Sequence, residues 1–219
     1  MTEPFEIPHD WTFKNLAVAE NFDRHVREQL PWYELTTGVI AHVARHYIPE
    51  GGMVYDIGAS TGNVGRAIAD TLKARGATLE AIDNSPQMAD LYAGPGVLHI
   101  CDATDFDFQP FDLAVCFLTL MFVQPAKRGA FLSMLRERCR PGGAIVIFDR
   151  TVPGSGYSAT VLWRLALAGK VAAGADPKDV IAKELSLSGV QRPIDPKELP
   201  GGVEVFRFGD FAGWIIEAA

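Results

Sequence analysis

Short apolar runs alternate with helical patterns through the middle of the chain. The first four runs each end in a turn that a helical pattern or a loop follows. The fifth comes after a helical pattern at 126–139 and an Arg-Pro-Gly-Gly turn at 140–143. Parallel strands need a crossover between them, so this alternation predicts a parallel sheet. The five predicted strands are residues 53–57, 78–83, 97–101, 113–118 and 144–149.

The two ends of the chain differ from this middle part. Two helical patterns, 15–29 and 33–47, come first and end at a Pro-Glu-Gly-Gly stretch. After the fifth run, helical patterns at 158–173 and 177–187 lead to two apolar runs joined by Gly209-Asp210, which is typical of a hairpin. We therefore predict an α/β fold with a seven-stranded, mostly parallel sheet and a C-terminal antiparallel hairpin. Residues 1–50 form a helical lead-in, and residues 51–219 form the main part of a single globular domain.

The amino-acid composition and net charge indicate which kinds of ligand and which cellular location to expect. The 219 residues are 48% hydrophobic and 21% charged, with a net charge of -7, which favours a small-molecule substrate over direct nucleic-acid binding. Three cysteines without CxxC spacing suggest neither disulfides nor a zinc cluster, and residues 1–14 lack the apolar core of a signal peptide. We expect a cytoplasmic protein. The apolar pattern at 158–173 is too short to span a membrane and suggests a buried or dimer-facing helix.

The most informative motif joins the first strand to the next helix. Gly58, Ala59 and Ser60 follow the strand and open a helical pattern at 64–74. Glycine lets a backbone approach a ligand closely, and a helix N-terminus offers N–H groups to a carboxylate. Asp56, just before the turn, is expected to face a cationic amino group of the ligand. The alternative is an ordinary strand–helix turn.

Acidic residues end the next two strands. Asp83 lies 21 positions after Gly62, which suits a carboxylate that accepts both hydroxyls of a ribose, and Ser85 rather than Asp83 is placed to cap the following helix. Asp102 ends the third strand, where it could meet the exocyclic amine of adenine or cap a loop. Met88 could pack against the adenine face or lie in the core. Together these residues predict a nucleotide-bearing cofactor.

Two short motifs suggest other chemistry, namely a serine hydrolase and a metal site. The stretch from Gly58 to Gly62 matches G-x-S-x-G, the nucleophile motif of serine hydrolases, but the one later histidine, His99, lies inside a predicted strand. The sequence therefore disfavours a hydrolase. His42 and His46 have the spacing of metal ligands on a helix but lack a third ligand motif, so we expect no metal site.

At this level of detail the chain resembles the SAM-dependent methyltransferases, and among them the carboxy-SAM synthases of tRNA wobble-uridine modification. The resemblance runs from about Phe22 to the C-terminus. It includes Ser60, where many methyltransferases have glycine, and the terminal hairpin. It rests on the segments 22–23, 30–33, 54–60, 81–86, 119–122, 140–143 and 206–209.

The resemblance implies a cofactor and a reaction. The cofactor is S-adenosylmethionine (SAM), with carboxy-SAM or S-adenosylhomocysteine as its products, and the reaction transfers a carboxyl group from prephenate to the SAM methyl. Members are usually homodimers. Cofactor contacts carried over to matching positions are Tyr33, Gly58, Ala59, Ser60, Asp83, Asn84, Asp102 and Ala103.

Two positions depart from the family pattern. Phe117 matches a further cofactor-binding position, but the family has an asparagine there. No arginine lies near Lys183-Glu184, where the family has one that holds the added carboxylate. Lys183 is an imperfect substitute for a bidentate guanidinium, and Arg150 and Arg192 are alternative sources of charge. The sequence leaves open a carboxy-SAM synthase, a methyltransferase acting on a small molecule or tRNA, and a SAM-binding protein without catalysis. It identifies no catalytic residue.

Overall fold

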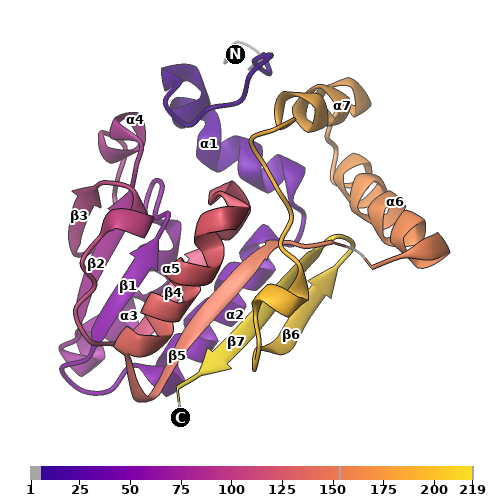
Figure 1. The fold of residues 1–219 in the computed structure, drawn as a ribbon. Helices are drawn as coiled ribbons and strands as arrows, with labels where there is room; N and C mark the ends of the chain where they lie inside the picture. Colours follow the sequence, from indigo (N-terminus) through magenta and orange to yellow (C-terminus); the bar gives the residue numbers. More distant parts are fainter. Residues whose placement is uncertain (1–5, 153, 219) are drawn as a thin grey trace.

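A single seven-stranded sheet forms the centre of the computed structural model, which describes residues 6–152 and 154–218 (Figure 1). The strand order is β3-β2-β1-β4-β5-β7-β6, with β1 to β5 parallel and β7 antiparallel to both of its neighbours. The predicted fold class is therefore confirmed. The strands are β1 (Met53–Ile57), β2 (Thr78–Asp83), β3 (Val97–Ile100), β4 (Phe111–Phe117), β5 (Cys139–Arg150), β6 (Val203–Phe208) and β7 (Phe211–Glu217).

Helices cover both faces of this sheet. Residues of α2 and α3 share one core with Val54, Val115 and Val146, while α5 shares a second core with the alternate positions of the same strands. This is the period of two expected of strands buried on both faces. The helices are α1 (Leu16–Gln29), α2 (Tyr33–Tyr47), α3 (Asn63–Arg75), α4 (Pro86–Ala89), α5 (Pro125–Arg138), α6 (Gly156–Ala172) and α7 (Pro177–Ser186).

The predicted turn at 140–143 is wrong, because β5 begins at Cys139 and runs through it. The N–H of Gly142 donates to the carbonyl of Ala218, and the N–H of Ala218 donates to the carbonyl of Gly143. Gly142 accommodates the bend with a left-handed φ of +80°, and the register with β4 shifts between Phe111 and Leu113. Pairing with the distant C-terminal strand thus turns a Pro-Gly stretch into an irregular strand.

Helices α1, α6 and α7 lie beyond the carboxyl ends of the parallel strands (Figure 1). Helix α6 is not the buried helix that its apolar sequence allowed, since Tyr157, Val161, Trp163 and Leu165 are exposed. Of the helices in the described part of the chain, none has both the length and the apolar character that a membrane crossing requires.

Two fully buried carboxylates lie at the ends of central strands. Asp56 in β1 accepts a hydrogen bond from the N–H of Gly65 in the first turn of α3, and burial raises its pKa to about 7. Asp149 in β5 accepts hydrogen bonds from the N–H groups of Thr119 and Met121, and burial likewise raises its pKa to about 7. Each acid therefore fixes a turn while resisting ionisation.

We predict that the free energy of unfolding of Asp56→Asn increases relative to that of the wild type as pH rises. The folded-state pKa of Asp56 lies above its ordinary value of 3.8. Its stabilisation is thus full below pH ~4 and is lost as pH rises to ~7, because the unfolded chain ionises first. Urea unfolding at pH 4 and pH 8 should show a relative gain for the variant on the order of 3 kcal/mol. Glu50→Gln, at an exposed turn, is the matched control, and a pH-independent difference for Asp56→Asn would contradict the prediction.

Candidate functional site

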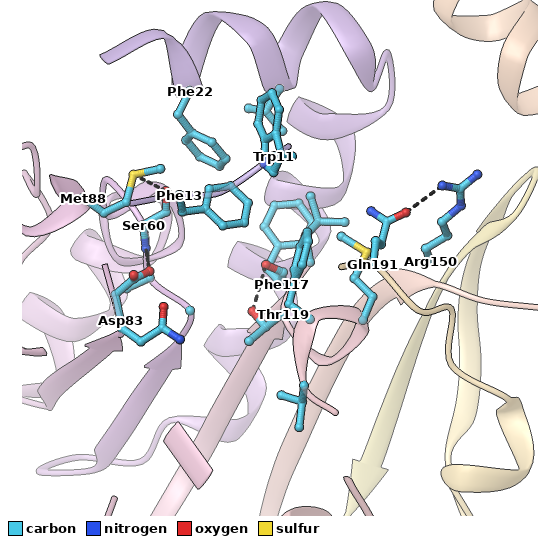
Figure 2. Close-up of a pocket in the computed structure, with 18 of the residues that line it drawn as sticks. Trp11, Phe13, Phe22, Ser60, Asp83, Met88, Phe117, Thr119, Arg150 and Gln191 are labelled. Carbon is cyan, nitrogen blue, oxygen red and sulfur yellow. Dashed lines mark hydrogen bonds between the residues drawn. The ribbon is translucent and has the colours of Figure 1, made fainter. Parts of the chain in front are cut away.

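One cavity of about 330 Å³ opens at the carboxyl ends of the parallel strands (Figure 2). It brings together ten of the eleven residues that the sequence suggested for cofactor binding. On one side, which we call the loop side, lie residues from the ends of β1, β2 and β3. The ten predicted residues that line the cavity as a whole are Tyr33, Gly58, Ala59, Ser60, Asp83, Asn84, Met88, Asp102, Ala103 and Phe117.

The turn after β1 has a backbone conformation that is sterically restricted. Gly58 has a φ of +75°, and a side chain there would collide with Thr119. Ser60 has a φ of +52°, which is uncommon for a residue with a side chain and is typical of functional sites. The Ser60 N–H donates to Asp83 Oδ2 at 2.8 Å, and its hydroxyl donates to Met88 Sδ at 3.4 Å. The turn is therefore held by its neighbours in a single conformation.

The contacts of Ser60 also bear on the hydrolase alternative. Its hydroxyl is directed at a thioether, which cannot accept a proton as a catalytic base does. His99, the histidine considered for that role, lies in β3 beside Glu80, with its Nε2 3.4 Å from Glu80 Oε2, and does not line the cavity. The structure thus offers no Ser60–His99 pair.

Asp83 retains hydrogen-bonding capacity. Its Oδ2 accepts from Ser60 N–H at 2.8 Å and its Oδ1 from Ser85 N–H at 2.9 Å. Burial raises the pKa of Asp83, although the N–H groups of Ser85, Ser60 and Asn84 oppose that shift. A carboxylate has about four acceptor positions, so both oxygens can still accept a hydrogen bond from a ligand.

Asp102 caps a loop, the alternative that the sequence had left open. Its Oδ1 accepts from both the N–H and the hydroxyl of Thr104, at the start of a short 3₁₀ helix, Ala103–Asp105. Burial alone would raise the pKa of Asp102, but the Thr104 hydrogen bonds and nearby Lys127 lower it. Asp102 is therefore an anionic acceptor that lines the cavity while one oxygen is engaged.

Asp56 is the exception among the predicted residues. It lies behind the turn, 1% exposed, and is not among the residues that line the cavity. Its carboxyl group accepts a hydrogen bond from the Gly65 N–H, and Oδ2 has no hydrogen-bond partner among the described residues. The expectation that Asp56 faces the ligand directly is therefore wrong, because β1 directs this side chain under α3 rather than into the opening.

Aromatic rings form the middle and the roof of the cavity. Tyr33 stacks on Phe117 with ring centroids 5.0 Å apart. Trp11, Phe13 and Phe22 also line the cavity, and Figure 2 shows Trp11 and Phe22 above Phe117. These three residues could not be predicted to line the cavity from the sequence, because they lie more than 30 residues from the strand ends and share no motif with them.

Helix α1 is attached to the turn after β1 by side-chain hydrogen bonds. Asp23 Oδ1 accepts from the Thr61 hydroxyl and from Asn63 Nδ2, each at 2.7 Å. The helical lead-in therefore supplies part of the cavity wall.

The opposite side of the cavity, which we call the charged side, carries Arg150, Lys170, Lys183, Glu184 and Gln191. Arg150, at the end of β5, lies 2.9 Å from Glu184 Oε2 in α7 and donates to Gln191 Oε1 at 2.6 Å. Lys170 of α6 lies 3.0 Å from Glu184 Oε1. An arginine therefore does reach the Lys183-Glu184 region, although it comes from another part of the chain. Arg192, the other candidate source of charge, does not line the cavity.

Lys183 lies in an environment that disfavours its charged form. Burial, with a smaller effect of Lys170, lowers the pKa of Lys183 to about 5, and its amino group contacts the ring of Trp11. Burial and the nearby lysines also lower the pKa of His25 to about 3. Burial therefore disfavours the charged forms of Lys183 and His25, and a carboxylate bound beside Lys183 would favour its protonation.

The residues described in the structure contain no group of three potential metal ligands. His42 and His46 pack against each other, with ring centroids 4.9 Å apart. Their helical spacing therefore produces a ring contact.

Residues 54–143 match the model of the methyltransferase domain family. This segment contains β1 to β4, the loop side of the cavity and the start of β5.

Comparisons with individual proteins agree with this match. The chain is 28% identical to carboxy-S-adenosyl-L-methionine synthase of Staphylococcus epidermidis, over 95% of this chain and 93% of that protein. It is 29% identical to the synthase of Yersinia pestis, over 64% of this chain, but spans only 56% of that protein's length. The solved plantazolicin methyltransferase BpumL, in complex with SAH, superposes with a TM-score of 0.61 at 10% identity, covering 92% and 89% of the two chains. The chain is therefore similar to SAM-dependent methyltransferases in its fold and to carboxy-SAM synthases in its sequence, and these similarities support a transferase that uses S-adenosylmethionine.

Proposed function

We propose that the chain transfers a carboxyl group to the methyl of SAM, in the manner of a carboxy-SAM synthase. The observation that carries this proposal is the placement of Arg150, Lys170 and Lys183 in the same cavity as the cofactor residues. A carboxylate-bearing second substrate needs cationic partners when it leaves water, whereas a neutral methyl acceptor does not. The relatives named carboxy-SAM synthase support the same assignment.

The loop side suits the adenosine and methionine parts of the cofactor. Asp83 has acceptor positions left for two ribose hydroxyls, and Asp102 has one oxygen left for the adenine amine. The N-terminus of α3, which follows the turn, offers N–H groups to the methionine carboxylate. Asp56 supports this end of α3 from behind, so it acts as a positioning residue.

The proposed reaction balances without an oxidant or reductant. A C–H bond of the sulfonium methyl breaks, and its electron pair forms a C–C bond to the carboxyl carbon of the donor. The donor's own bond to that carbon breaks as well. In prephenate its electron pair enters the ring, which becomes aromatic as the ring hydroxyl leaves as hydroxide, and the released proton converts this hydroxide to water. Arg150, Lys170 and Lys183 would hold the donor, which the resemblance suggests is prephenate.

Ordinary methyl transfer to a small molecule is the second candidate. It is favoured by Phe117, which replaces the family's asparagine and stacks with Tyr33, so the middle of the cavity is apolar. Methyl transfer depends mainly on in-line positioning of the two reactants, which an apolar pocket can supply.

A role in tRNA modification, a cytoplasmic location and a homodimer belong to the proposal as well. They follow from the resemblance to carboxy-SAM synthases. The exposed apolar side chains of α6 are compatible with a second subunit, since large exposed apolar patches commonly mark interfaces. The net charge of -7 favours a route in which the small-molecule product, rather than this chain, reaches the RNA.

We predict that Asp83→Ala weakens SAM binding by ~1–3 kcal/mol, because a buried carboxylate would no longer accept the ribose hydroxyls. Asp83→Asn, which keeps one acceptor oxygen, should lie between Asp83→Ala and the wild type. Calorimetric titration with SAM measures the effect, and circular dichroism checks the fold. Adenosine and 2′,3′-dideoxyadenosine serve as paired probes. If Asp83→Ala weakens both equally, Asp83 does not bind the ribose hydroxyls.

Mass spectrometry of the reaction products distinguishes the two candidate functions. With SAM and prephenate, we expect a product heavier than SAM by the mass of carbon dioxide, and the same species carried through purification. Omission of prephenate is the control. Formation of S-adenosylhomocysteine with a methylated acceptor, and no carboxylated product, would replace the synthase assignment with methyl transfer.

A further inference from the structure

The charged side of the cavity is electrically balanced by the chain itself. Arg150 pairs with Asp210 Oδ2 at 2.7 Å and with Glu184 Oε2 at 2.9 Å, and Lys170 pairs with Glu184 Oε1 at 3.0 Å. Two cations therefore face two carboxylates. Burial alone would raise the pKa of Glu184, but Arg150 and Lys170 hold it below its usual range, so Glu184 is ionised.

Glu184 and Asp210 contact different nitrogens of Arg150, Nη2 and Nε respectively. Asp210 is almost fully buried and does not line the cavity, whereas Glu184 does. A single carboxylate that bridges an arginine and a lysine is the arrangement that an anionic substrate would itself adopt there. Glu184 therefore occupies charge-binding capacity that a second ligand carboxylate would need.

Lys183 is the remaining basic residue on this side. The Glu184 oxygens are directed at Arg150 and Lys170, so Lys183 is left facing Trp11, His25 and Lys170. One carboxylate entering the cavity can be neutralised by this amine together with a proton. A second carboxylate would lack a partner.

We propose that Glu184 is a specificity-determining residue that limits the charged side of the cavity to one carboxylate group of the second substrate. This inference rests on the proposed function, since it assumes that the second substrate binds there. It is a role for the chain's own acid, distinct from the cations that would hold the substrate. Removing its charge should leave Arg150 and Lys170 undercompensated, and the site should then favour more highly charged anions.

The test compares two ligands that share a ring and differ by one carboxylate, phenylacetate and phenylmalonate, titrated into the SAH-saturated protein. In Glu184→Gln the side chain keeps its size, and its amide oxygen can still accept a hydrogen bond from Arg150 or Lys170, so α7 retains one of the two contacts. We expect affinity to rise roughly threefold for phenylacetate and roughly tenfold for phenylmalonate, because the Coulomb energy scales with ligand charge and partial exposure weakens it.

Glu198→Gln is the matched control, because Glu198 pairs with buried Arg128 outside the cavity. It should leave the ratio of the two affinities unchanged. Asp210→Asn removes a charge from the same Arg150 without altering the cavity wall, so it should shift the ratio in the same direction as Glu184→Gln. This second variant supplies the test if Glu184→Gln does not fold.

Equal changes for both ligands, or no binding of either ligand to wild type and variant, would overturn the inference. A uniform loss of affinity would show that Glu184 only ties α7 to α6 and β5. If the wild type fails to bind SAH, the proposed function is wrong, and titration of the SAH-free protein then tests Glu184 separately.

Discussion

The carboxyl edge of the sheet is held together by acidic side chains that accept hydrogen bonds from the turns of neighbouring strands. Asp83, at the end of β2, accepts from Ser60 N–H in the turn after β1. Asp149, near the end of β5, accepts from Thr119 and Met121 N–H after β4. A buried carboxylate is tolerated only when such donors replace water. These bonds fix the floor of the cavity before any ligand arrives.

The apolar pattern of the sequence predicts most strand and helix boundaries, but it does not predict contacts between segments that lie far apart in the chain. The boundaries of β1, β2, β6, β7 and α2 follow directly from apolar periodicity and from the residues that end each run. The start of β5 could not be predicted, because Gly142 and Gly143 pair with Ala218, more than 70 residues away. Likewise, the motif spacing placed Asp83 correctly at the cavity, but it could not show that Asp56 points beneath α3.

The charged side of the cavity is a second feature that the sequence pattern does not predict. The net charge of -7 is a property of the whole chain and does not reveal that the basic side chains Arg150, Lys170 and Lys183 gather in one cavity. The family resemblance predicts an arginine close to Lys183 in the sequence, and the chain has none there. The sheet instead brings Arg150 from the end of β5 to within 2.9 Å of Glu184. Proximity in space, set by strand order, thus supplies a guanidinium that proximity in sequence does not.

Phe117, which stacks with Tyr33, lies between Ser60 and Asp83 on one side and Gln191 and Arg150 on the other (Figure 2). An asparagine at position 117 would place a donor and an acceptor in the middle, whereas phenylalanine confines polar recognition to the loop side and the charged side. An aromatic face is still a favourable neighbour for a cation, because its quadrupole attracts positive charge. The sulfonium of the proposed cofactor, which cannot donate a hydrogen bond, suits such a surface. The replacement of asparagine is therefore compatible with binding of the cofactor, and its consequence falls on the second substrate, which must be recognised at the charged side.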